Sequence, residues 1–144
     1  MDDTEERALL GLLRARDLGV LVTLKRDGRP QLSNVNFAYD PDARVVRISV
    51  TASRAKARNL ARDPRASFHV TSPDGWAWTV VEGDAELSEA AREPYDAAVD
   101  ELVDVYRALR GEHPDWDEYR AAMVADQRQV VRLPIGRVYG QTVR

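Results

Sequence analysis

Short runs of alternating apolar and polar residues, joined by links of hairpin length, constrain the fold of this chain most. Residues 31–39 alternate in this way, and residues 44–50 repeat the pattern. Asp27-Gly28, just before the first of these runs, is a strong signal for a tight hairpin turn. Because parallel strands need crossovers of a dozen or more residues, links this short favour antiparallel pairing. We therefore expect an antiparallel β-structure and not a doubly wound sheet.

The segments before and after these strands have the apolar spacing of helices. Apolar spacing predicts helices at residues 4–16 and 88–111, and a further helix that begins at Asp115, where Glu118 completes a capping box. A short helix is predicted inside residues 53–65, between two strands. Six short strands with helices packed outside them predict a small barrel that the C-terminal strand closes.

Composition excludes several classes of site. The chain has no cysteine, so disulfides, thiolate zinc sites and a cysteine nucleophile are absent. His69 and His113 lie far apart in the sequence, and we expect no metal site built from them. The 21 basic residues are balanced by 24 acidic ones, which does not fit a nucleic-acid-binding protein. The acidic N-terminus and the lack of a long apolar run predict a cytoplasmic protein without a membrane span.

Positive charge gathers in SRAKARNLARDPR, residues 53–65, although the formal net charge of the chain is -3. A short helix that follows a strand offers free backbone amides to a phosphate, and Arg54 and Lys56 flank that entry. Arg58 lies one turn further along the same face. Taken alone, the segment fits a solvated helix face slightly better than an anion site. We expect Arg62 and Arg65 to be surface charges in either case.

Two other segments could contribute to a ligand site. Amide and hydroxyl groups crowd one predicted face of the strand QLSNVN, residues 31–36, and could bind the edge of a heterocycle or simply face solvent. Trp76 and Trp78 share one predicted strand face, where they could stack on a planar ligand, pack in a dimer interface or enter the core. The sequence contains no nucleophile motif and assigns no catalytic residue, so any chemistry is expected to come from a bound cofactor.

Four segments together carry a family resemblance: GVLVTLKRDGRPQLSNVNFAYD, SVTASRAKARNLARDPRASFHV, DGWAWTVVEGDAEL and GEHPDWDEYRAAMVADQRQVVRLPIGRVYG. They resemble the flavin/deazaflavin oxidoreductase superfamily of the pyridoxine-phosphate-oxidase-like class, and in particular its actinobacterial members that depend on coenzyme F420. The resemblance implies a single domain, residues 1–144, that is mainly β with α. It would be an FMN-binding split β-barrel, with six antiparallel strands in Greek-key order and flanking helices.

The resemblance also implies a cofactor site. In such proteins the cofactor phosphate meets the equivalents of Arg54 and Lys56, the strand end 49–51 runs beside the ring, and residues 31–34 lie at its other edge. The residues implied to contact the cofactor are Gln31, Ser33, Asn34, Ser49, Val50, Thr51, Arg54, Lys56, Arg58, Asn59, Trp76, Gln127 and Arg128.

Such barrels are typically homodimers with two sites at the interface, and Trp76 and the segment Gln127-Arg128 would reach across from the partner. The implied cofactor is coenzyme F420, whose acidic tail Arg26, Arg58 and Arg128 could accept. The implied activity is hydride transfer to an unidentified small organic acceptor. FMN-dependent oxidation of a vitamin B6 phosphate is the alternative, although no second cation cluster for it is evident. Binding of deazaflavin, FMN or haem without turnover is a further alternative.

Overall fold

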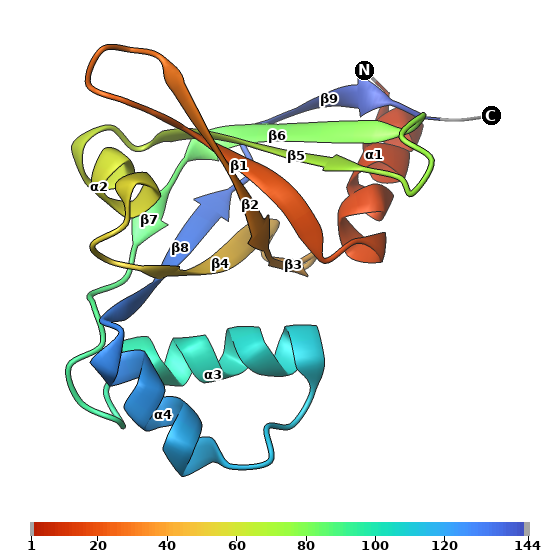
Figure 1. The fold of residues 1–144 in the computed structure, drawn as a ribbon. Coiled ribbons are helices and arrows are strands. Elements are labelled where there is room, and N and C mark those ends of the chain that lie inside the picture. The colour runs from red at the N-terminus through yellow and green to blue at the C-terminus, as the bar shows by residue number, and fades with distance from the viewer. Residues whose placement is uncertain (1, 143–144) are drawn as a thin grey trace.

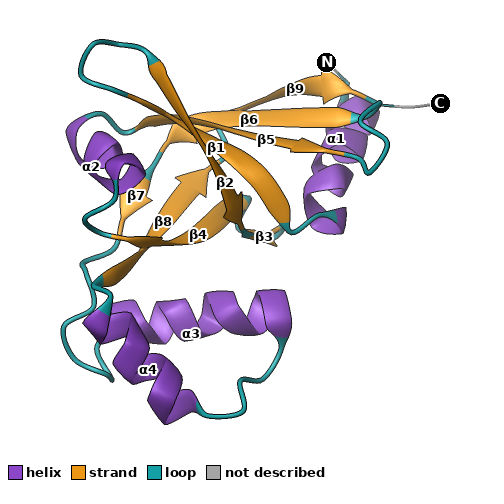
Figure 2. Cartoon of the chain, viewed as in Figure 1, coloured by secondary structure: helices purple, strands orange, loops and turns teal. Residues whose placement is uncertain are grey.

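The computed structural model describes residues 2–142, which form four helices and nine strands (Figures 1 and 2). Met1, Val143 and Arg144, which belong to the expected domain, lie outside the described residues. In chain order the elements are α1 (Asp3–Ala15), β1 (Leu18–Leu24), β2 (Pro30–Asn36), β3 (Ala38–Asp40), β4 (Val45–Thr51), α2 (Ala55–Arg62), β5 (Arg65–Thr71), β6 (Trp78–Asp84), β7 (Glu86–Leu87), α3 (Ala97–Arg110), α4 (Trp116–Ala125), β8 (Arg128–Pro134) and β9 (Arg137–Gln141).

All strand pairs are antiparallel and form two sheets, as the hairpin-length links predict. One sheet has the order β2-β1-β5-β6-β9, and the other has the order β3-β4-β8-β7. Three runs of chain bend from one sheet into the other, at Phe37 between β2 and β3, at Ala85 between β6 and β7, and at Gly136 between β8 and β9. The six expected runs therefore become nine strands of a split β-barrel.

The apolar core fills the space between the two sheets. Phe37 and Phe68 meet there edge to face, with ring centroids 4.7 Å apart, and both side chains are fully buried. Helix α1 packs against β5, β6 and β9, whereas α2 packs against β1 and β7. The hairpin of α3 and α4 lies against β4 and β8, on the outer side of the smaller sheet (Figure 1).

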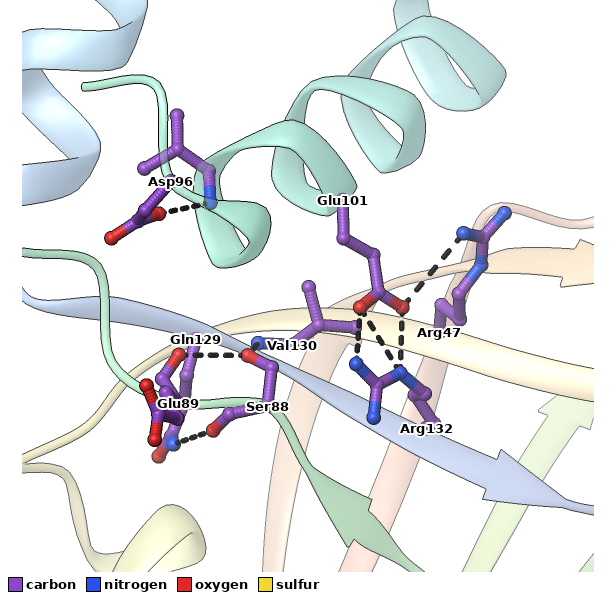
Figure 3. Close-up of polar contacts among 9 residues, drawn as sticks. Arg47, Ser88, Glu89, Asp96, Glu101, Gln129, Val130 and Arg132 are labelled. Atoms are coloured by element: carbon purple, nitrogen blue, oxygen red, sulfur yellow. Dashed lines mark hydrogen bonds and ion pairs between the residues drawn. The ribbon is translucent and has the colours of Figure 1, made fainter. Parts of the chain in front are cut away.

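An ion pair fastens α3 to that sheet (Figure 3). The Arg132 guanidinium on β8 donates to both carboxylate oxygens of Glu101, with Nε 2.8 Å from Oε2, and Arg47 of β4 adds a contact at 3.9 Å. Beside it, Ser88 Oγ accepts from the backbone amide of Val130 at 2.8 Å. The ion pair thus fixes α3 to the two inner strands of the smaller sheet, and the Ser88 bond fixes the chain that leads into α3.

Two local predictions are wrong. The helix expected from Ser88 begins only at Ala97, because the Asp96 side chain caps it by accepting from the backbone amide of Val99. Trp76 lies outside the strand, which starts at Trp78. In the part of the chain that the structure describes, no helix is both long and apolar enough to span a membrane.

Candidate functional site

The first turn of α2 has no side-chain cap. Strand β4 ends at Thr51, whose carbonyl accepts from the backbone amide of Arg54 at 3.0 Å, and α2 starts one residue later. Arg54 occupies the N-cap position and makes no capping hydrogen bond through its side chain. The amides of the first turn are thus open to an external acceptor, as expected for a phosphate-binding helix start.

A cavity of about 310 Å³, here called the α2 cavity, lies at this helix start. Its lining combines the ends of β2, β4 and β8 with the start of α2 and one side chain of α3. The lining residues are Asn34, Val35, Asn36, Ser49, Val50, Thr51, Arg54, Lys56, Leu109 and Arg128. Seven of the thirteen residues implied by the resemblance are among them, and no lining residue is acidic.

Three cations of the α2 cavity act on one another. Burial lowers the pKa of Lys56, and the positive charges of Arg54 and Arg128 lower that pKa further. Arg128 Nη1 donates weakly to Ser49, at 3.5 Å from its carbonyl and 3.4 Å from Oγ, and Nε is buried without a hydrogen bond. Its nearest acid, Asp126, lies 3.9 Å from Nε and outside the cavity lining.

This arrangement fits a bound phosphate group. An anion would offset the mutual repulsion of the cations and accept hydrogen bonds from the free helix amides. It would also supply the negative charge that the lining lacks. The structure therefore supports an anion site where the sequence left a solvated helix face as the slightly favoured alternative.

Three other implied residues lie on a different side of α2. Gln31, Arg58 and Asn59 line a second cavity of about 720 Å³, the hairpin cavity, together with Lys25, Arg26, Asp27, Ala55, Ala61 and Arg62. Asn59 is only 7% exposed, and its amide nitrogen donates to Thr23 Oγ1 at 3.1 Å and to Gln31 Oε1 at 3.4 Å. This side chain joins α2 to the β1–β2 hairpin.

Arg62 shows a function that the sequence did not reveal. Its Nη2 donates to the Leu24 carbonyl at 2.6 Å and to Asn59 Oδ1 at 3.3 Å, so it helps to hold α2 on the hairpin. Arg65, by contrast, pairs with the neighbouring Asp63, and the side chain of Arg65 is exposed. The expected surface role fits Arg65, whereas Arg62 is part of the packing.

The polar residues of β2 do not share one face, contrary to the sequence-based expectation. Gln31 and Ser33 point to the same side as the buried Val35, while Asn34 and Asn36 alternate with them and are exposed. Only the second pair lines the α2 cavity. Gln31 faces Asn59, and Ser33 lines neither of the two cavities.

Trp76 and Gln127 lie outside both cavities. Trp76 is 69% exposed in the turn between β5 and β6, which lies beside α1 at the far end of the molecule from α2 (Figure 1). It does not pair with Trp78, which packs edge to face on Tyr139 with centroids 6.0 Å apart. Gln127 adopts a left-handed backbone conformation (φ 52°), and its carbonyl accepts from the Ala52 amide at 3.0 Å, which holds the loop before α2.

Comparisons with known proteins place this architecture. The family described as pyridoxamine 5′-phosphate oxidase matches residues 6–142. A solved F420 reductase is 26% identical, with 90% of this chain and 94% of that chain covered and a TM-score of 0.63. A conserved hypothetical protein from Mycobacterium tuberculosis is 24% identical, with 97% and 84% covered and a TM-score of 0.72. A haem-binding protein from Mycobacterium smegmatis is 23% identical, with 99% and 58% covered and a TM-score of 0.65.

Proposed function

Because the chain belongs to the pyridoxamine 5′-phosphate oxidase family, we propose that it is an oxidoreductase that binds coenzyme F420 in the α2 cavity and reduces a small organic acceptor. One observation carries this proposal. Three cations converge on an uncapped helix start, and no acidic residue lines the cavity that they share. Such a site favours the phosphate of a flavin-type cofactor.

The residues of the α2 cavity take different roles in this proposal. Arg54, Lys56 and the first amides of α2 hold the phosphate. Ser49 keeps Arg128 directed into the cavity, and the strand end at Thr51 offers backbone and hydroxyl groups to the remainder of the cofactor. When bound and reduced, the deazaflavin supplies a hydride. The protein then contributes position and exclusion of water rather than a side-chain acid or base.

Two observations favour F420 over FMN. A solved F420 reductase shares 26% identity with the chain over 90% of its length. The hairpin cavity also offers positive charge for the carboxylates of an acidic tail, since Lys25, Arg26, Arg58 and Arg62 line it and Asp27 is its one acid. The Asp27 carboxylate already accepts from the Arg29 amide at 3.0 Å.

The proposal includes a homodimer with a site at each end of the interface. In the single chain Trp76 does not line the α2 cavity, and the turn between β5 and β6 that carries it lies at the other end of the molecule from α2 (Figure 1). Exposed Leu18 and Leu32 on the β1–β2 hairpin provide apolar surface for a second copy. In that dimer Trp76 and Gln127 complete the site of the partner, whereas Arg128, which was expected to reach across with them, lines the cavity of its own chain.

Titration calorimetry with oxidised F420, FMN and haem tests the cofactor. We expect F420 to bind most tightly, and Lys56→Ala to weaken it by roughly 10- to 100-fold through loss of a charge-assisted hydrogen bond. Arg65→Ala is the control and should leave F420 affinity unchanged, because Arg65 is exposed and pairs with Asp63. Tight binding of FMN or haem without F420 would contradict the proposal, and native mass spectrometry tests the dimer.

A further inference from the structure

Two buried side-chain polar atoms lack a hydrogen-bond partner within residues 2–142, and both are arginine Nε atoms. One belongs to Arg128 of the α2 cavity, and the other belongs to Arg16, the residue that ends helix α1. Buried donors are almost always satisfied, because leaving one unpaired costs about 1–3 kcal/mol. Both atoms are covered by the protein itself, and the two guanidinium groups that carry them line neighbouring cavities.

Arg16 lines a cavity of about 350 Å³, here called the α1–α3 cavity. Its walls are the end of α1, the β2–β3 bend and the end of α3, with the lining residues Leu13, Arg14, Ala15, Arg16, Asp17, Phe37, Ala38, Tyr39, Ala108 and Leu109. This volume lies within the usual range for a small-molecule site. Leu13 and Phe37 belong to the core and are each only 1% exposed, so Ala108 and the half-buried Leu109 are the apolar side chains that a ring or a short hydrocarbon can contact.

The α1–α3 cavity adjoins the α2 cavity. Leu109 of α3 lines both cavities. At the β2–β3 bend the chain also passes from one to the other, because Asn36 lines the α2 cavity and the next residue, Phe37, lines the α1–α3 cavity. A molecule bound beside Arg16 would thus be a neighbour of the part of a cofactor that lies beside Asn36 and Leu109 in the α2 cavity. An acceptor needs to lie next to the redox-active ring of its cofactor, and this boundary is where the two could meet.

The charged residues of the α1–α3 cavity indicate what it binds. Arg14 and Arg16 are its cations and Asp17 its one acid, and Tyr39 adds a hydroxyl whose pKa burial raises, so that it stays neutral at pH 7. No ion pair of 4.0 Å or less joins Arg16 to Asp17 in the described residues. The Nε atom itself is covered by the protein, so the terminal nitrogens of the Arg16 guanidinium are the donors that can hold a planar oxyanion, through two parallel hydrogen bonds.

We propose that the α1–α3 cavity is the acceptor site and that Arg16 selects small planar acceptors that carry a carboxylate. The proposal deepens the proposed function, on which its redox meaning rests, because it names the substrate class of the same enzyme. Ala108 and Leu109 contact the apolar body of the acceptor, and Arg16 holds its carboxylate. Arg16 is here a specificity-determining residue and takes no part in moving the hydride.

The test compares two matched probes, 4-nitrobenzoate and 4-nitrobenzamide, which differ in charge but hardly in shape. Binding to the ¹⁵N-labelled chain is followed by NMR titration. We expect the carboxylate to bind at least about tenfold more tightly, with shifts centred on Ala38, Ala108 and Leu109. Arg16→Gln should remove this preference and leave amide binding unchanged. Arg16→Lys should retain part of it, which keeps the test valid if the glutamine variant folds poorly.

Arg110→Gln is the matched control. Arg110 is an exposed cation in the last turn of α3 that lines neither cavity, so its loss should not alter the preference. Equal binding of the two probes by the wild type, or the same loss in the control, would overturn the proposal. F420 titration separates the two claims: Arg16→Gln should bind F420 like the wild type. Carboxylate selection without F420 binding would contradict only the proposed function, and F420 binding without selection would contradict only this inference.

Discussion

Replacing Lys56 by methionine should separate two properties that the α2 cavity combines, the stability of the unliganded chain and its affinity for phosphate. Burial and the charges of Arg54 and Arg128 lower the pKa of Lys56 below its ordinary value. Between the folded and the unfolded pKa the native state binds fewer protons, so stability rises with pH in that window. Below that window the lysine is charged in both states, and its charge therefore destabilises the native state. Methionine keeps a similar length and removes the charge.

The expected gain is small because solvent screens the half-buried ammonium group. We expect Lys56→Met to raise the free energy of unfolding by up to about 1 kcal/mol at low salt. For a chain of this size that raises Tm by roughly 3 °C. The same variant should lose most of the stabilisation that added pyrophosphate gives to the wild type, since binding to the native state is what stabilises it.

Urea unfolding at pH 7, at low ionic strength and in about 0.5 M NaCl, measures the effect. Lys25 is the other lysine of the chain, and it is exposed on the β1–β2 hairpin, so Lys25→Met is the matched control. The gain should appear in Lys56→Met alone and shrink in salt. A loss of stability in Lys56→Met, an equal gain in the control, or a gain that salt does not reduce would refute the idea that the cations repel one another in the empty site.

Three further predictions concern the fold. Glu101→Gln should lower the free energy of unfolding in urea by about 1–3 kcal/mol, because the carboxylate is only 17% exposed and leaves a guanidinium without its partner. Arg65 lowers the pKa of Asp63 from 3.8 to about 2. The stability that their pair contributes is therefore complete above pH 3.8 and is lost as the pH falls towards 2. The difference in unfolding free energy between the wild type and Asp63→Asn should disappear over the same range when both are measured in a pH series. Gly83→Ala should destabilise the chain by about 2 kcal/mol or more in thermal unfolding, because the added Cβ would collide with a backbone carbonyl of β8.

The sequence predicts the strands well because their evidence is local. Alternation and turn residues mark each run, and the antiparallel pairing follows from the short links. The bends are different, since they depend on partners far along the chain. The Phe37 amide donates to the Asp17 carbonyl at 3.0 Å, and the Ala85 amide donates to the Pro64 carbonyl at 2.7 Å. No local pattern encodes such contacts, so the split barrel was predicted by the family resemblance and not by the alternation of residues.

The candidate site was predictable to a similar extent. The charge cluster and its position after a strand identify Arg54 and Lys56, which the structure places at the same cavity. The orientation of α2 about its axis determines where the side chains of the remaining cations lie, and it directs Arg62 to the Leu24 carbonyl. The Trp76 turn is longer than the sequence suggests, because the Asp74 carboxylate accepts from the Trp76 amide at 3.0 Å and delays the strand.

The hydrogen bonds of the arginine side chains distinguish those that stabilise the fold from those that are available for a ligand. Arg62 and Arg132 satisfy their guanidinium groups within the protein and hold helices in place. Arg16 and Arg128 each leave a buried Nε–H without a hydrogen bond, which lowers the stability of the folded chain. Both border cavities that meet at Leu109. A chain selected only for stability would pair or replace these groups. We therefore propose that both cavities hold anionic ligands, which would lie side by side and accept hydrogen bonds from the terminal nitrogens of Arg16 and Arg128.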